Sequence, residues 1–150
     1  MLRAILAVIV GYVAMAVAVF GTFTGAYLIL GADGSFRPGS YEPSGLWLVV
    51  SFVLGFGAAL LGGTVCRAIA RSHKPVAILA VVVVALGALS AIPMLLASGA
   101  EPAVRTGDVG NIEAMQNART PLWVALSNPI VGAVGVLLAG RARGTQARSG

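Results

Sequence analysis

The sequence predicts an all-α, polytopic membrane protein with four transmembrane helices in an antiparallel bundle. Of its 150 residues, 58% are hydrophobic and only 10% are charged, whereas a soluble domain carries about 25% charged residues. This number of charged residues is too small to cover a water-exposed surface. The apolar residues are therefore expected to face lipid. The length fits a single domain.

Four segments are long and apolar enough to cross a bilayer. A transmembrane helix needs about 20 mainly apolar residues to span about 30 Å of hydrocarbon. The four segments cover residues 4–30, 46–66, 75–97 and 122–140. Each is apolar on all sides, as lipid-exposed helices are. We therefore expect a transmembrane domain over residues 1–140 and a disordered cytoplasmic tail over 141–150.

The first segment also has features of a secretion signal. Arg3 precedes it, and the run Ala14-Met15-Ala16 resembles a cleavage site. The apolar stretch continues to Leu30, however, far beyond the roughly 7–15 residues of a signal. We expect a retained helix.

The basic residues predict one orientation. With four spans, the N-terminus, the second loop and the tail share one side, and cytoplasmic loops carry an excess of Lys and Arg. That side holds seven of the ten basic residues: Arg3, Arg67, Arg71, Lys74, Arg141, Arg143 and Arg148. All five acidic residues lie on the other side: Asp33, Glu42, Glu101, Asp108 and Glu113. Both termini are therefore expected in the cytoplasm. The Ala, Gly and Arg content is typical of a GC-rich bacterial genome, so the predicted location is a bacterial cytoplasmic membrane.

Two loops differ in character. The outer loop over residues 31–45 is rich in Gly, Pro and Ser, which favours turns. The outer loop over residues 98–121 is longer, and Asn111 is placed to cap a short helix within it.

Small residues recur at four-residue spacing within the spans. Such pairs form a flat stripe that lets helix backbones approach closely. The pairs are Gly21 with Gly25, Ala58 with Gly62, Ala59 with Gly63, and Gly87 with Ala91. One interpretation is packing within this chain. The other is a seam for a second copy or for a helix of a partner membrane protein.

The run Ser127-Asn128-Pro129 interrupts the fourth span. Proline removes a backbone donor and frees a carbonyl one turn upstream, so a kink is predicted between Leu126 and Pro129. The Asn128 amide needs hydrogen-bond partners and should face other helices. It either fixes helix packing or contacts a ligand or ion.

Uncharged polar residues concentrate in the outer halves of the spans. They are Thr22, Thr24, Ser51, Ser90, Ser127 and Asn128. If these side chains converge, they form a polar pocket open to the outside. Alternatively, the Ser and Thr hydroxyls bond to their own helices.

The residues that the spans lack restrict the function further. None contains a charged residue or histidine well inside it, although such residues mark proton relays and coupled transport. The chain has one cysteine and one histidine, and no HExxH, GxSxG or P-loop motif. We therefore expect no enzyme activity, metal or cofactor. No basic run alternates with aromatic residues, so nucleic acid is not an expected partner.

These observations predict a small, non-enzymatic integral membrane protein surrounded by the lipid bilayer. Its expected action is helix packing with itself, as a homo-oligomer, or with a partner membrane protein. The alternative is binding or transport of a small molecule or ion through the outer polar pocket, near the helix break at Asn128 and Pro129.

Overall fold

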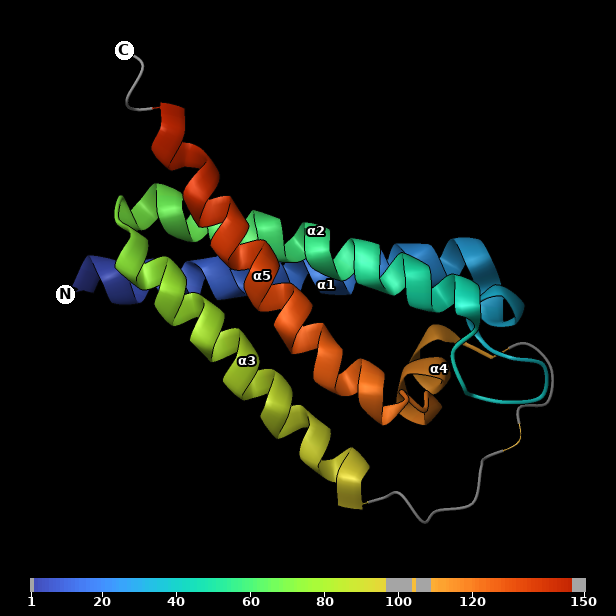
Figure 1. The fold of residues 1–150 in the computed structure, drawn as a ribbon. Helices are drawn as coiled ribbons and strands as arrows, with labels where there is room; N and C mark the ends of the chain where they lie inside the picture. Colours follow the sequence, from blue (N-terminus) through green and yellow to red (C-terminus); the bar gives the residue numbers. More distant parts are fainter. Residues whose placement is uncertain (1, 97–103, 105–108, 147–150) are drawn as a thin grey trace.

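The computed structural model describes residues 2–96, 104 and 109–146. Its elements are the helices α1 (Leu2–Ser35), α2 (Gly45–Ala70), α3 (His73–Leu96), α4 (Asn111–Asn117) and α5 (Leu122–Gln146) (Figure 1). All except α4 are long and apolar enough to cross a membrane. The four predicted spans are thus confirmed as long apolar helices.

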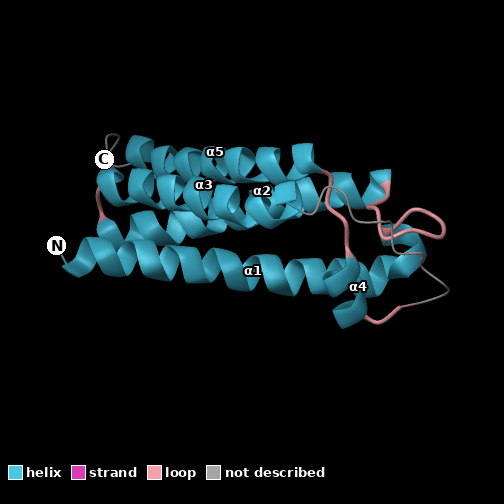
Figure 2. Cartoon of the chain, turned by 90° about the horizontal axis from the view of Figure 1, so that it is seen from below, coloured by secondary structure: helices cyan, strands magenta, loops and turns pink. Residues whose placement is uncertain are grey.

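The helices pack in the order α1, α2, α5, α3. α1 packs along α2, α2 packs on α5, and α5 packs on α3, while no described Cα atoms of α1 and α5 lie within 8 Å of each other. The start of α1, the α2–α3 turn and the end of α5 lie at one end of the molecule (Figures 1 and 2). We call this the turn end. The opposite end, which carries α4 and residues 36–44, is called the α4 end.

α1 is longer than its predicted span. Gly31 interrupts it with φ 65° and ψ −176°, a conformation open to glycine because it lacks a Cβ. One further helical turn, Ala32–Ser35, follows where the sequence predicted a loop. At about 1.5 Å per residue the part of α1 before Gly31, residues 2–30, extends over about 43 Å, more than the roughly 30 Å of hydrocarbon. One end of α1 therefore projects beyond the hydrocarbon, or the helix tilts.

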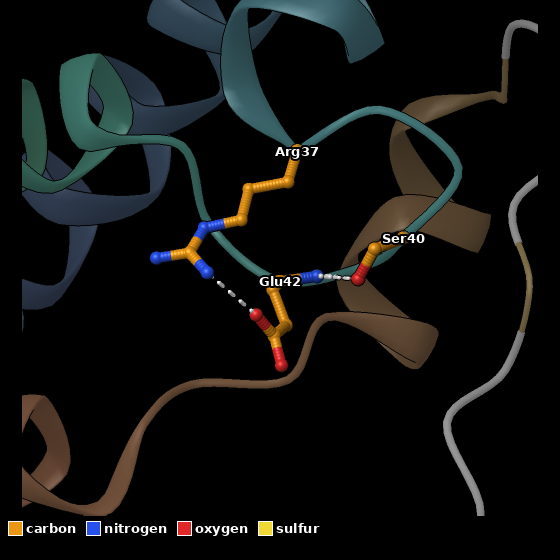
Figure 3. A network of polar contacts seen from close by, with 3 residues as sticks. All are labelled: Arg37, Ser40 and Glu42. Carbon is orange, nitrogen blue, oxygen red and sulfur yellow. Dashed lines mark hydrogen bonds and ion pairs between the residues drawn. The ribbon is translucent and has the colours of Figure 1, made fainter.

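The connection from α1 to α2 is a hydrogen-bonded loop. The Ser44 Oγ accepts a hydrogen bond from the Trp47 backbone N–H at 3.0 Å and so caps α2. Arg37 Nη1 lies 3.2 Å from Glu42 Oε2, and the Ser40 Oγ accepts from the Glu42 backbone N–H at 3.0 Å (Figure 3). Both charged side chains are solvent-exposed, so this ion pair contributes only about 0–1 kcal/mol. The loop conformation depends mainly on its backbone bonds and on the Ser44 cap.

At the turn end, α2 and α3 are joined by a short turn. α2 continues to Ala70, past the predicted end at residue 66, and Arg71 follows in a left-handed conformation with φ 56°. The Arg71 N–H donates to the Arg67 carbonyl at 2.9 Å. The Arg3 Nε donates to the Ile69 carbonyl at 2.7 Å, which ties the start of α1 to the end of α2. Basic residues suit this position because a helix C-terminus carries partial negative charge.

Two helical details differ from the sequence prediction. α5 runs as one helix through Pro129 and continues beyond residue 140 to Gln146, so the helix is not broken at Asn128 and Pro129 as predicted. Of the predicted tail, residues 147–150 lie outside the described part. The short helix α4 is confirmed. Its N-cap is Gly110, however, which has no side chain for a capping bond, and Asn111, the predicted cap, is the first helical residue.

Close helix packing depends on glycines that face neighbouring backbones. A Cβ at Gly62 would lie 2.8 Å from the Gly11 carbonyl oxygen, and one at Gly63 would lie 2.5 Å from the Val136 carbonyl oxygen. A Cβ at Gly87 would overlap the Pro129 ring. The partners in the predicted pairs, Ala58, Ala59 and Ala91, are also buried. These three pairs therefore lie inside the molecule, where they allow α2 to approach α1 and α5, and α3 to approach α5.

Buried residues form two clusters, one at each end. The larger cluster lies toward the turn end and comprises Ala7, Ala59, Cys66, Val76, Leu79, Ala80, Val83 and Val136. The smaller cluster lies at the α4 end and comprises Tyr27, Ala32, Phe36, Tyr41 and Ala114.

Candidate functional site

Two adjoining cavities run from the middle of the molecule toward the α4 end. The first, of about 460 Å³, is lined by residues of α1, α2, α3 and α5. The second, of about 430 Å³, follows α1 to α4. They share four lining residues of α1, namely Tyr12, Met15, Val19 and Phe23. We call the combined space the α1 groove.

The groove exists because α1 separates from the helices opposite it. Near the turn end α1 is close to α3, since a Cβ at Gly11 would lie 3.1 Å from Leu79 Cδ2. Toward the α4 end α3 diverges from α1 (Figure 1), and no described Cα atom of α5 lies within 8 Å of one in α1. The space between them is bounded by side chains of α2 and is not filled by any other helix.

Three predicted polar residues line the 460 Å³ cavity from three different helices. They are Ser51 of α2, Ser90 of α3 and Asn128 of α5, joined by Thr120. Ser51 and Asn128 each lie six residues after the first residue of their helix, and Ser90 lies six residues before the last residue of α3. At about 1.5 Å per residue, all three lie about 9 Å from the helix ends that face the α4 end. The cavity therefore has one polar level.

The hydrogen bonds of these three residues differ. The Ser51 hydroxyl donates to the Leu48 carbonyl at 2.9 Å, and the Ser90 hydroxyl donates to the Gly87 carbonyl at 2.7 Å. Asn128 lines the cavity, is exposed, and makes no side-chain hydrogen bond with the described residues. Asn128 thus offers a free donor and a free acceptor, while each serine offers only oxygen lone pairs.

The other predicted pocket residues lie apart from this level. Thr24 lines the second cavity. The Thr22 hydroxyl donates to the Ala18 carbonyl at 2.6 Å, and the Ser127 hydroxyl donates to the Trp123 carbonyl at 2.7 Å. Neither Thr22 nor Ser127 lines either cavity. The structure therefore brings together three of the six residues, places a fourth nearby, and leaves two bonded to their own helices.

The sequence did not single out the aromatic walls of the groove. Eight aromatic side chains line it: Tyr12, Phe20, Phe23, Tyr27, Phe36, Trp47, Phe52 and Phe56. The Tyr12 hydroxyl has no hydrogen bond in the described part of the chain. The spacing of Phe20, Phe23 and Tyr27 along one helix face was a usable signal. It was not decisive, because the whole span is apolar and no face stands out.

Aromatic contacts and hydrogen bonds close the groove at the α4 end. The Tyr27 hydroxyl donates to the Val109 carbonyl at 2.7 Å, and the Tyr41 hydroxyl donates to Glu113 Oε1 at 3.0 Å. The Trp47 ring packs edge-on against Phe23 and Tyr27, with centroids 5.9 and 6.3 Å away. Residues 109–118 therefore cover this end of the groove.

The acidic residues of this end do not form a site in the described structure. Glu42 pairs with Arg37, and Glu113 accepts the Tyr41 hydroxyl. Glu101 and Asp108 lie outside the described residues. Among the residues that are described, no three His, Cys, Asp or Glu side chains gather closely enough to hold a metal ion.

The fold and groove define a class, that of small helical proteins with four potential membrane spans and a largely apolar internal cavity. Comparison with known proteins does not assign the chain to a family within that class. No protein family, no curated protein and no solved structure matches it.

Proposed function

We propose that this is a multi-pass membrane protein whose α1 groove binds a small, largely apolar molecule. The observation that carries this proposal is Asn128, which lines the cavity at the level of Ser51 and Ser90 and whose side chain makes no hydrogen bond with the described residues. A polar group without a hydrogen-bond partner is unfavourable in apolar surroundings such as lipid hydrocarbon. A ligand that hydrogen-bonds to Asn128 removes this cost.

The lining residues favour an uncharged ligand over an ion. They include no Asp, Glu, Lys, Arg, His or Cys. Cavities of about 430 and 460 Å³ with apolar walls and a few polar groups fall in the range of small-molecule sites. The lining hydroxyls have no His, Lys, Asp or Glu among the lining residues to act as a base for them, which favours binding over catalysis.

We further propose that the α4 end lies outside a bacterial cytoplasmic membrane and that both termini lie in the cytoplasm. The distribution of Lys and Arg supports this orientation. In a Cys66→Ser background, a membrane-impermeant maleimide should label Pro38→Cys in intact cells and Ser72→Cys only after lysis. The opposite pattern would reverse the orientation.

A cavity-filling substitution tests the ligand site. Gly55 lines the 460 Å³ cavity, and a Cβ there would meet nothing within 4 Å. Gly55→Phe should therefore fill the cavity without a clash. We expect native mass spectrometry from lipid nanodiscs to show a small molecule that is retained by the wild-type protein and lost, by about tenfold or more, from Gly55→Phe.

Gly57→Phe is the matched control. Gly57 lies on the same helix, also has open space at its Cβ position, and does not line either cavity. It should retain the molecule like the wild type. Equal retention by all three proteins, or none by the wild type, would refute the ligand site.

Self-association is a second candidate, favoured by the one small-residue pair that is not used inside the molecule. At both Gly21 and Gly25, a Cβ would meet nothing within 4 Å. The α1 face that carries them is therefore free to approach a second copy or a partner helix closely.

Substitution at both glycines tests this candidate. If α1 forms a dimer seam, Gly21→Leu/Gly25→Leu should abolish a dimer detected by cross-linking in nanodiscs, while its thermal stability stays that of the wild type. Gly57→Leu, open but outside the pair, should leave the dimer unchanged. A wild-type protein that stays monomeric under these conditions argues against the seam.

A further inference from the structure

The length of the α1 groove points to a chain-like occupant. Along α1 the lining runs from Tyr12 to Tyr27, which is about 22 Å at about 1.5 Å per residue. One leaflet of hydrocarbon is about 15 Å deep, half of the roughly 30 Å core. The groove is therefore long enough to hold an extended hydrocarbon chain from one leaflet.

The groove is open on its side and covered at its α4 end. Phe20 and Leu86 line it and are nevertheless 63% and 42% exposed, on surfaces of α1 and α3 that lie within their apolar stretches. The α4 end is closed by the contacts of Tyr27 and Tyr41 with residues 109–118. A molecule dissolved in the bilayer can enter sideways, whereas entry from the α4 end is obstructed.

The depth of the polar level restricts the charge of the head group that the bound molecule can carry. A bilayer has a total thickness of about 40–45 Å and a hydrocarbon core of about 30 Å, which leaves a polar interface of about 5–8 Å on each side. Ser51, Ser90 and Asn128 lie about 9 Å from the helix ends, which is deeper than this interface. No charged side chain lines the groove, so a phosphate or carboxylate there would lack a counter-ion. An uncharged head can sink to this level.

The hydrogen-bond inventory specifies the head further. The hydroxyls of Ser51 and Ser90 already donate to their own helices, so each oxygen can only accept. The Asn128 amide can both donate and accept. A hydroxyl group complements this set, since it donates to the serine and amide oxygens and accepts from the amide N–H.

From these features we propose, building on the ligand site above, that the α1 groove binds a neutral membrane lipid with one long chain and a hydroxyl-bearing head. The chain lies along Met15, Val19 and Phe23 of α1, and the head lies at Asn128. The lipid exchanges with the surrounding leaflet through the side opening between α1 and α3.

Photolabelling in nanodiscs tests the chain and the head separately. Three diazirine probes share one long chain and differ in the head: a monoacylglycerol, the fatty acid methyl ester and the ionised fatty acid. We expect the monoacylglycerol to label residues 12–27 most strongly. Asn128→Leu should reduce its labelling about five- to tenfold, as expected for loss of the head's hydrogen bonds, and reduce that of the methyl ester, whose oxygens can only accept, by less. Asn128→Gln, which keeps the amide, should restore part of the labelling.

Two tryptophan variants show whether the groove holds the chain. Val19→Trp should fill the groove and abolish labelling by all three probes. Val17→Trp, on the exposed side of the same helix and outside both cavities, should label like the wild type. Equal labelling of these two variants would overturn the lipid site, and the ligand site would then be decided by the Gly55→Phe comparison. A different result would overturn only the assignment of a hydroxyl-bearing lipid. In that result Val19→Trp blocks labelling, but the three probes label equally and the Asn128 substitutions have no effect.

Discussion

Gly62→Val is expected to be the most destabilising single substitution proposed, lowering the free energy of unfolding by about 3 kcal/mol or more. Its Cβ would lie 2.8 Å from the Gly11 carbonyl oxygen and 2.9 Å from Met15 Cβ. The reverse clash exists too, since a Cβ at Gly11 would lie 2.9 Å from the Gly62 carbonyl oxygen. Overpacking against side chains typically costs 1–3 kcal/mol. Here a backbone must move, so α1 and α2 have to separate.

The measurement is unfolding of the purified protein in one detergent, followed by circular dichroism. Gly57→Val is the control, because it makes the same change in helix propensity on the same helix at a site with open space. It should unfold close to the wild type. Similar losses for Gly62→Val and Gly57→Val would mean that propensity and not the contact between α1 and α2 determines the effect.

The sequence predicted the number and approximate extent of the long helices because uninterrupted apolar length is a sufficient signal for a span. It placed the ends less well, and for local reasons. Gly31 allows one further turn, Ala32–Ser35, after an interruption, and the backbone conformation of a single glycine is not visible in composition. α2 and α5 continue past their apolar stretches because arginines are compatible with the last turns of a helix.

Which faces meet was only partly predictable. Small residues at four-residue spacing marked Gly62, Gly63 and Gly87, which do oppose neighbouring helices. The same spacing marked Gly21 and Gly25, which oppose nothing. The pattern identifies a helix face that can pack closely, but it does not identify the helix that packs against it. These spans are apolar on all sides, so no polar face shows which side of a helix points away from its neighbours.

The depth of the candidate site along the helices was predictable from the sequence, but the full set of residues that line it was not. Ser51, Ser90 and Asn128 share a depth because the topology places equal numbers of residues between each of them and the α4 end. That could be counted from the sequence. Thr22 and Ser127 share the region but lie on helix faces that line neither cavity, and the face on which a residue lies depends on how the helices pack. The aromatic walls required the divergence of α1 from α3, which is a property of tertiary packing.

Pro129→Gly should rescue the loss of stability that Gly87→Ala causes. A Cβ at Gly87 would overlap Pro129 Cγ and lie 2.6 Å from Pro129 Cβ, whereas the Pro129 Cα is 3.6 Å away. Gly87→Ala alone should therefore lower the free energy of unfolding by about 1–3 kcal/mol, as overpacking does. In a Pro129→Gly background only the ordinary contact with Cα remains, so the same alanine should be nearly neutral.

The coupling between the two substitutions, measured as a double-mutant cycle, is expected to be about 1–3 kcal/mol. Additive effects would show that the two residues do not touch and that α3 and α5 pack in another register. A positive coupling has a consequence for the groove. Gly87 lies one helical turn from Ser90, and Pro129 follows Asn128 directly, so close contact of Gly87 with the Pro129 ring holds the two polar residues on adjoining walls of the same cavity. The proline that was expected to break α5 thus helps, as part of an unbroken helix, to set the width of the site.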